Sequence, residues 1–288
     1  MKYAYFPGCS LHSTAIDYDE SAKALAGALG LELMEVPGWS CCGSTPAHST
    51  NQLLAAALPA KNLVAAKAIS DEMVVCCSAC FSRFKFAQKH LEEKPQLRAQ
   101  VADMMPAADA QKVRVRHLID ILTNDVGPEA IAKAKKRDTG LKVACYYGCL
   151  ITRPPKVTQL DDPENPRFMD DLLKAAGMET IDWPCKTDCC GATFSLTRTE
   201  TVLRLSAEIL QMAKEAGADC IGVACPLCHT NLDLRQSDVE RKLGVKYGLP
   251  VFYFTQLLGM ALGLNAGELG IGRGLVSCKQ LLAAKGVV

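Results

Sequence analysis

Two cysteine groups of the same form, one in each half of the 288-residue chain, constrain its fold and chemistry more than any other feature. Each group has a single Cys, an adjacent Cys pair followed by Gly, and a C-x-x-C motif. Both copies place 34 residues between the second Cys of the pair and the first Cys of the C-x-x-C. Repetition of this spacing indicates an internal duplication, and therefore two similar halves.

The patterned cysteines number five in each half. The first group is Cys9, Cys41, Cys42, Cys77 and Cys80, and the second is Cys149, Cys189, Cys190, Cys225 and Cys228. The remaining cysteines have no patterned counterpart and are interpreted as buried or incidental thiols: Cys76, Cys145, Cys185, Cys220 and Cys278.

The composition is that of an ordinary globular protein, with 49% hydrophobic and 22% charged residues and a formal net charge of +1. Such a balance offers no basic field for nucleic acid or an anionic membrane. The longest apolar stretches are much shorter than the roughly 20 residues that span a bilayer, and the first residues do not resemble a signal peptide. We therefore expect a cytoplasmic protein, in which many cysteines indicate metal binding or redox catalysis rather than disulfides.

Each half alternates strands with helices, which predicts an α/β fold of two similar halves, each a small, mostly parallel sheet with flanking helices. We expect strands at 2–6, 31–36, 73–77 and 113–118, then at 142–146, 179–183, 220–224 and 251–254. We expect helices at 16–29, at 51–69, from 80 and after 118, then at 168–176, 199–216 and 255–262. The predicted domains are residues 1–123 and 141–288, joined by a charged, helical linker at 124–140.

Ligands of parallel α/β folds gather at the carboxyl ends of the strands, and the single cysteines and C-x-x-C motifs fall there in both halves. A structural zinc ion or a cubane [4Fe–4S] cluster takes four ligands, so five thiols are one too many for either. Adjacent cysteines reach two irons of a cluster more easily than one small ion. The residues therefore favour an iron–sulfur centre that uses the fifth thiolate, or a cubane with one spare Cys. Zinc is the structural alternative.

The motif C-x31-CCG-x33-C-x-x-C, duplicated with a longer first gap in the second copy, resembles the CCG signature of the catalytic B subunit of heterodisulfide reductase. The resemblance extends over the whole chain and includes Tyr5–Cys9, Tyr147–Cys149, Arg153–Pro155 and Thr255–Gly259. It implies two non-cubane [4Fe–4S] clusters, each held by one five-cysteine group. It further implies that the clusters face each other across the two halves and split a disulfide bound between them. One departure is Tyr146, where methanogen subunits commonly carry a His.

Four further residues are candidates for substrate binding. Arg153 and Lys156 follow Cys149 closely, and their charges suit a carboxylate, sulfonate or phosphate group of an anionic substrate. Tyr146, beside the second group, could form a pocket wall or donate a proton. His229 follows Cys228 and could donate a hydrogen bond to a cluster sulfur or protonate a product thiolate.

The leading interpretation is an enzyme, a disulfide oxidoreductase of the heterodisulfide reductase type that is active within a complex. The chain has no flavin or dinucleotide fingerprint and no ferredoxin-type cysteine run, so it needs partners that deliver electrons. The resemblance implies a ferredoxin-like C subunit and a flavin-containing A subunit. The alternatives are a CCG-type electron-transfer subunit of a dehydrogenase or quinone-linked complex, and a zinc-stabilised interaction protein.

Overall fold

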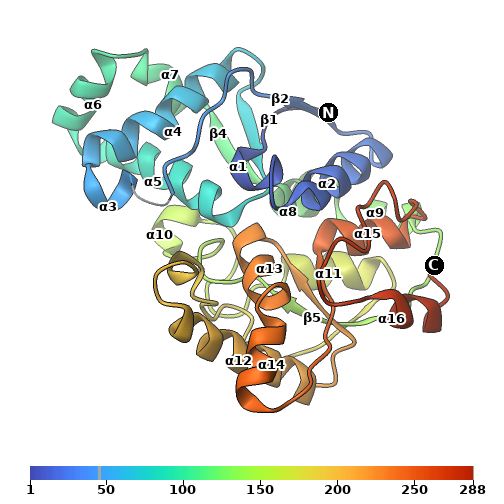
Figure 1. Ribbon diagram of the computed structural model, residues 1–288. Coiled ribbons are helices and arrows are strands. Elements are labelled where there is room, and N and C mark those ends of the chain that lie inside the picture. The colour runs from blue at the N-terminus through green and yellow to red at the C-terminus, as the bar shows by residue number, and fades with distance from the viewer. Residues whose placement is uncertain (45–46, 288) are drawn as a thin grey trace.

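Two four-stranded parallel sheets, each with helices packed on it, form the two halves of the chain (Figure 1). The computed structural model describes residues 1–44 and 47–287. The first sheet consists of β1 (Lys2–Phe6), β2 (Glu32–Glu35), β3 (Glu72–Val75) and β4 (Arg114–His117). The second consists of β5 (Lys142–Tyr146), β6 (Glu179–Thr180), β7 (Cys220–Val223) and β8 (Val251–Tyr253). The α/β class and the duplicated architecture expected from the sequence are confirmed.

The two sheets have the same topology, with strand orders β2-β1-β3-β4 and β6-β5-β7-β8. In each sheet the second strand lies on one side of the first strand, and the third and fourth strands lie on its other side. The direction in which strands are added therefore reverses between β1 and β3 and between β5 and β7. In open parallel sheets, the crevice beyond the carboxyl ends of the strands at such a reversal is where ligands bind. The segments after β1, β3, β5 and β7 carry Cys9, Cys77, Cys149 and Cys225.

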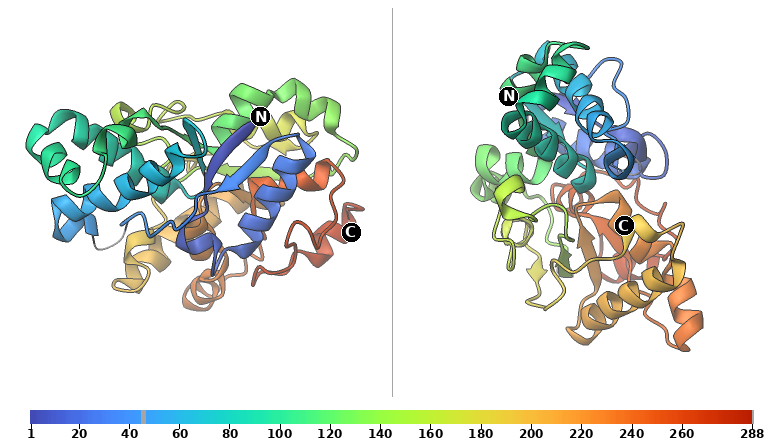
Figure 2. Two further views of the ribbon diagram at one scale, coloured as in Figure 1. Left: turned by 90° about the horizontal axis from the view of Figure 1, so that it is seen from above. Right: turned by 90° about the vertical axis from the view of Figure 1, so that its left-hand side faces the viewer.

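The helices enclose the sheets on both faces, as the two further views show (Figure 2). In the first half they are α1 (Gly8–Leu11), α2 (Ile16–Ala28), α3 (Ala47–Thr50), α4 (Gln52–Lys67), α5 (Ser78–Glu93), α6 (Pro95–Ala102), α7 (Ala107–Lys112) and α8 (Leu118–Ile121). A π-helical turn (Leu122–Val126) and α9 (Pro128–Ala134) lead to the second half. There the helices are α10 (Pro155–Thr158), α11 (Phe168–Ala175), a 3-10 turn (Ala192–Phe194), α12 (Thr199–Glu215), α13 (Pro226–Asp233), α14 (Gln236–Leu243), α15 (Phe254–Ala261) and α16 (Lys279–Ala284).

Two of these helices start directly at a C-x-x-C motif. Cys77 is the N-cap residue of α5, and Cys225 is the N-cap residue of α13, with extended backbone angles in both cases. Pro226 stands at the first position of α13, where its missing N–H costs nothing because the first helical N–H groups have no intrahelical partner. Both C-x-x-C motifs therefore occupy a strand-to-helix turn at the amino end of a helix.

The strands expected from the sequence are confirmed to within two residues at their ends, except the one expected at 179–183. β6 ends at Thr180, because the chain beyond Ile181 leaves the sheet and Trp183 donates its indole N–H to the carbonyl of Cys145 at 3.0 Å. The expected helices are also found: α2, α4, α11 and α12 are shorter than expected by one to three residues, α5 begins two residues earlier, and α15 is displaced by one residue. Sequence analysis missed several short helices, among them α6, α7 and α14, which have eight residues or fewer and so give few turns over which a helical period can be recognised.

The predicted linker, 124–140, contains α9 and then an extended stretch. The backbone N–H groups of Lys136 and Arg137 both donate to the carbonyl of Ala261 in α15, so this stretch is attached to the second half. We propose the division into 1–123, 124–140 and 141–288 as the domain boundaries. The hydrophobic core itself is continuous through both halves.

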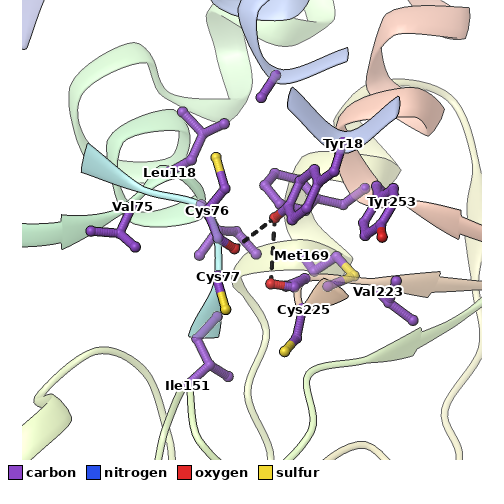
Figure 3. Packing of buried hydrophobic residues seen from close by; sticks show 14 of the residues in the cluster. Tyr18, Val75, Cys76, Cys77, Leu118, Ile151, Met169, Val223, Cys225 and Tyr253 are labelled. Carbon is purple, nitrogen blue, oxygen red and sulfur yellow. Dashed lines mark hydrogen bonds between the residues drawn. The ribbon is translucent and has the colours of Figure 1, made fainter. Parts of the chain in front are cut away.

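Tyr18, on α2 of the first half, forms hydrogen bonds to the backbone of both halves (Figure 3). Its buried hydroxyl lies 3.0 Å from the carbonyl of Cys76 and 3.4 Å from the carbonyl of Ala224, the residues that follow β3 and β7. Its ring stacks on Tyr253 at the end of β8, with centroids 4.0 Å apart. α2 also packs against α15, where the hydroxyls of Ser21 and Thr255 are 2.7 Å apart.

Both carbonyls have a second donor. His117 lies with Nε2 2.8 Å from the Cys76 oxygen, and the Ser78 hydroxyl donates to the Ala224 oxygen at 3.0 Å, again across the two halves. A buried network of this kind fixes the ends of β3 and β7 relative to each other, since unpaired buried polar groups are costly.

We expect Tyr18→Phe to lower the free energy of unfolding by about 1 kcal/mol, because each carbonyl keeps one other donor when the hydroxyl is lost. Urea denaturation of the purified protein measures this. Tyr247→Phe is the matched control, since the Tyr247 hydroxyl has no hydrogen bond to any described residue. Equal stability of the two variants would contradict a structural role for the Tyr18 hydroxyl.

Candidate metal centre

The ten patterned cysteines gather at the carboxyl edges of the two sheets. Cys9 lies in α1 directly after β1, Cys41 and Cys42 lie in the loop after β2, and Cys77 and Cys80 begin α5. The second half repeats this placement on the loops after β5 and β6 and on α13. All fifteen cysteines of the chain are free thiols.

In the first group the thiols form a chain of contacts. The Sγ atoms of Cys42 and Cys80 are 3.1 Å apart, and the thiols of Cys41 and Cys77 are close enough to Cys42 and Cys80, respectively, to affect their pKa values. The hydrogen bonds from Cys41 and Cys80 lower the pKa of the Cys42 thiol well below its usual value. Cys9 is near enough to raise the pKa of Cys41 electrostatically, as a smaller effect than the bond to Cys42 and burial.

The second group has the equivalent contacts. The Sγ atoms of Cys190 and Cys228 are 3.7 Å apart, and Cys225 is hydrogen-bonded to Cys228. Cys149 is hydrogen-bonded to Cys189, which lowers the pKa of Cys189 to about 6. Each half therefore brings its own predicted group together, and each contains at least one thiol stabilised as thiolate by its neighbours.

The two groups also meet each other. The thiols of Cys77 and Cys225 lie close enough across the halves to affect each other's ionisation, which raises the pKa of Cys77 and, together with Cys228, lowers the pKa of Cys225. Both side chains point to the same side, away from Tyr18, with Ile151 beside them (Figure 3). The two five-cysteine groups are therefore neighbours, and the C-x-x-C motifs lie where they meet.

The ten patterned cysteines differ in solvent exposure, and we call the buried ones the floor of the site and the others its rim. The floor is buried and consists of Cys42, Cys77, Cys80, Cys190, Cys225 and Cys228. The rim is open to solvent at Cys9, Cys41 and Cys189, with Cys149 partly covered. A ligand from solvent can therefore reach both groups from the rim, whereas the contact between Cys77 and Cys225 is enclosed.

Glycines at equivalent positions leave room for this sulfur. A Cβ on Gly8 would lie 3.2 Å from the Cys80 Sγ, and one on Gly148 would lie 2.9 Å from the Cys228 Sγ. Both glycines have positive φ, +72° and +69°, which disfavours any other residue. After the Cys pairs, the N–H groups of Gly43 and Gly191 donate to the Sγ atoms of Cys41 and Cys189 at 3.4 and 3.3 Å.

The donor set suits an iron–sulfur cluster. Thiolates are its ligands, backbone N–H groups donate to the sulfurs, and the glycines supply a cradle that a side chain would fill. Among the residues that the structure describes, no three His, Cys, Asp or Glu side chains converge in an arrangement that would hold a metal ion. The thiols come together in pairs and chains, a distribution that fits several metal atoms at each group better than one tetrahedral ion.

Two of the predicted substrate residues lie beside the second group. Tyr146 is buried, donates its hydroxyl to the carbonyl of Asp188 at 2.6 Å, and its pKa is raised by burial and by the nearby thiols. His229 lies with Nε2 3.1 Å from the carbonyl of Val251, and its ring stacks on Tyr253. Tyr146 therefore supports the loop that carries Cys189 and Cys190.

The other two predicted residues lie differently. Arg153 is half-buried and its guanidinium binds the carbonyl of Pro163, the carboxylate of Glu164 and the hydroxyl of Thr187. Lys156 is exposed on α10 and lines an open groove of about 600 Å³ together with residues at the start of β4. The start of β4 is at the opposite end of the sheet from the cysteines, so the structure does not bring Lys156 near the patterned cysteines.

Sequence analysis missed three residues that contact or adjoin the site: Tyr18, Arg83 and Asn231. The side-chain amide of Asn231 lies 3.6 Å from the Cys190 Sγ, and burial lowers the pKa of Arg83, an effect that the nearby Cys42 thiol partly offsets. Arg83 and Asn231 each stand three residues after a C-x-x-C motif, and this equal offset was a signal in the sequence. Tyr18 gave no such signal, because its partners are distant in the chain.

Comparison with known proteins agrees with this geometry. The family model described as a cysteine-rich domain, CCG, matches twice, at residues 3–85 and 143–233. Each match contains one five-cysteine group, which confirms the duplication. The chain belongs to the CCG cysteine-rich family, which includes the B subunit of heterodisulfide reductase.

Two relatives illustrate the range of this family. The chain is 31% identical over 97% of its length to the 8-methylmenaquinol:fumarate reductase membrane anchor subunit of Wolinella succinogenes, of which 99% is covered. It is 30% identical over 98% of its length to the B subunit of the ferredoxin/F420H2-dependent CoB-CoM heterodisulfide reductase of Methanosarcina acetivorans, of which 96% is covered. These relationships support an electron-transfer subunit with iron–sulfur chemistry.

A solved structure shares the fold. The crystal structure of a hypothetical protein from Helicobacter pylori superimposes with a TM-score of 0.74 at 14% identity, over 96% of this chain and 52% of that one. The chain thus spans about half the length of that protein. Within residues 1–44 and 47–287, no helix has the length and apolar character needed to cross a membrane.

We expect Gly148→Ala to remove about half of the bound iron and sulfide, because its Cβ would collide with the Cys228 Sγ while the first group stays intact. Iron and acid-labile sulfide per chain, measured after anaerobic purification, test this. Gly217→Ala is the matched control, with a similar φ of +78° and no atom within 4 Å of the added Cβ. Equal losses in both variants would mean that backbone strain, and not the cradle, is responsible.

Proposed function

We propose that this chain is the catalytic subunit of a heterodisulfide reductase-like complex, a disulfide oxidoreductase that reduces a disulfide to two thiols. The observation that carries the proposal is the position of Cys77 and Cys225, which directly follow the two carbonyls that Tyr18 joins and whose side chains point to the same side, so that the two equivalent five-thiol groups lie side by side across the two halves (Figure 3). A disulfide has two sulfurs and its cleavage consumes two electrons. Two adjacent redox sites can each act on one of the two sulfurs and supply one of the two electrons.

We further propose the ligands. The first [4Fe–4S] cluster would be held by Cys9, Cys41, Cys42, Cys77 and Cys80, and the second by Cys149, Cys189, Cys190, Cys225 and Cys228. Five thiols at each group favour non-cubane clusters. When bound, such clusters supply single electrons, so that RS–SR′ with two electrons and two protons gives RSH and R′SH.

The chain's own residues then have distinct tasks. The buried floor keeps Cys77 and Cys225 out of solvent, and the Tyr18 network fixes their separation. The exposed rim at Cys9, Cys41 and Cys189 admits the disulfide. Tyr146 holds the Cys189–Cys190 loop through Asp188. Arg153 and His229 stay predictions for contact with the substrate, and Lys156 is better placed for contact with another molecule at the groove beside α5.

The electrons must come from partner proteins. We propose a ferredoxin-like iron–sulfur C subunit and, behind it, a flavin-containing A subunit, because the chain lacks a nucleotide-binding fingerprint of its own. The relatives support this, since the Methanosarcina acetivorans protein is named as part of a reductase that uses ferredoxin or F420H2.

A second candidate function is electron transfer in a quinone-linked complex. It is favoured by the similarity to the Wolinella succinogenes protein, whose name describes a menaquinol:fumarate reductase. In that role the same two sites would pass electrons between partners without cleaving a disulfide. Dye-coupled assays distinguish the two: reduced viologen with a panel of disulfides that includes the CoB–CoM heterodisulfide, and separately a soluble menaquinol analogue with a partner dehydrogenase.

We expect Cys42→Ser and Cys190→Ser each to abolish disulfide reduction, since each removes one buried ligand and both sites act on one bond. The readouts are viologen-dependent disulfide cleavage and iron per chain, which should fall by about half. Cys278→Ser is the control: Cys278 is buried and outside the pattern, and its variant should keep near-normal activity.

Near-normal turnover of either patterned variant would refute the two-site mechanism. Zinc at about two per chain with little iron would refute the redox function altogether, because it would indicate structural sites.

A further inference from the structure

We propose that the basic groove beside α5 is the docking site for an acidic face of the electron-donating partner protein. The inference rests on the proposed function in one respect, that the chain receives its electrons from another protein. It assigns a binding surface that lies outside the cysteine pattern and apart from the rim through which a disulfide enters.

Both halves of the chain line this open groove of about 600 Å³. Residues of α5, α6, α7 and β4 line it from the first half, and α10, which packs against α5, lines it from the second (Figure 1). Among the described lining residues, one carries a carboxylate, Glu92, and six are cations: Lys85, Lys89, Arg98, Lys112, Arg114 and Lys156. Because the formal net charge of the whole chain is only +1, this is a local concentration of positive charge.

Neighbouring carboxylates neutralise only half of these cations. Three of them form ion pairs with N–O distances between 2.7 and 3.2 Å: Lys89 with Glu93, Lys112 with Asp109, and Arg114 with Glu72. The other three, Lys85, Arg98 and Lys156, form no ion pair with a residue that the structure describes. Three positive charges in one groove are therefore available to an anionic partner.

Lys85 lies on the wall of the groove that α5 provides, and it is half-buried without a counter-ion. Burial lowers its pKa, and the positive charge of Arg114 lowers it further. The wall itself is fixed, because the Gln88 amide donates to the carbonyls of Ala110 and Val113 at 3.0 and 2.7 Å and so attaches the segment between α7 and β4 to α5. An anion entering this groove would stabilise a charge that the fold leaves uncompensated.

The distribution of the cations favours a protein surface as the occupant. They stand on five different elements, whereas recognition of a small anion needs donors that converge on one group. Single-stranded nucleic acid is bound by aromatic stacking as well as by charge, and no aromatic side chain is among the described lining residues. Charges spread over a surface are typical of complementary protein interfaces, where they accelerate association and select the partner.

The location of the groove suits a partner that delivers electrons. α5 carries Cys80, and Lys85 follows it by five residues, which is roughly 8 Å along the helix axis. None of the described lining residues is a patterned cysteine, so a protein bound here leaves the exposed rim free. The partner and the disulfide can therefore be bound at the same time.

Binding of a labelled polyglutamate peptide of about ten residues to the anaerobic holoprotein, followed by fluorescence anisotropy, tests the docking site. We expect the groove variant, which combines Lys85→Gln, Arg98→Gln and Lys156→Gln, to bind the peptide about tenfold more weakly, because its three uncompensated charges are lost. The affinity of the wild type should also fall as the salt concentration rises from about 50 to about 200 mM.

The matched control removes three exposed cations that form no ion pair with a described residue and lie outside the groove, on α9, α11 and α16: Lys133→Gln, Lys174→Gln and Lys279→Gln. It changes the net charge by the same amount and should bind the peptide as the wild type does. Equal weakening in both triple variants would overturn the proposal. Tighter binding of a duplex oligonucleotide than of the peptide, or full competition by inorganic phosphate at the concentration of the peptide, would overturn it too.

Reduction of the holoprotein by an acidic plant-type ferredoxin, compared with reduction by a viologen, tests the identity of the partner. We expect the ratio of the two rates to fall about tenfold in the groove variant and to stay constant in the control variant. An unchanged ratio in a groove variant with normal iron content would overturn docking of the electron donor. A wild-type holoprotein that neither donor reduces would instead refute the proposed function, and the peptide titration separates that failure from this one.

Discussion

The arrangement of the site depends on the hydroxyl of Tyr18, which contacts the carbonyls of Cys76 and Ala224, the first residues after β3 and β7. Those strands belong to different halves, yet the residues that follow them, Cys77 and Cys225, must be neighbours for two sulfur groups to act together. Hydrogen bonds from Tyr18, Ser78 and His117 satisfy carbonyls that would otherwise be buried and unpaired. The hydrogen bonds that join the two halves therefore also place Cys77 beside Cys225.

Duplication explains most of the site, and the side chains around the repeated features differ between the two halves. Gly8 and Gly148 leave room for sulfur in the same way, and Gly43 and Gly191 donate to sulfur in the same way. The side chains around these common features differ, as Arg83 and Asn231 do.

The residues predicted to bind substrate, Arg153 and Lys156, do not belong to the duplicated cysteine pattern. Arg153 is engaged by Glu164 and Thr187, and Lys156 lies in a groove at the start of β4, although both follow Cys149 closely in the sequence. Proximity in the chain therefore does not carry Lys156 to the thiols, whereas Arg153 stays near the second group through its bond to Thr187. The open rim at Cys9, Cys41 and Cys189 is the route that remains for a disulfide.

The sequence by itself determined the α/β class, the duplication, the strand positions and the ten patterned cysteines, because repeated spacing and apolar periodicity are local properties of the chain. It also carried the equal offset of Arg83 and Asn231. Only the tertiary structure decided that Cys77 and Cys225 lie side by side, that Tyr18 joins the halves, and that the amide of Asn231 reaches the Cys190 Sγ. These depend on packing between residues up to about two hundred positions apart, which no local pattern encodes.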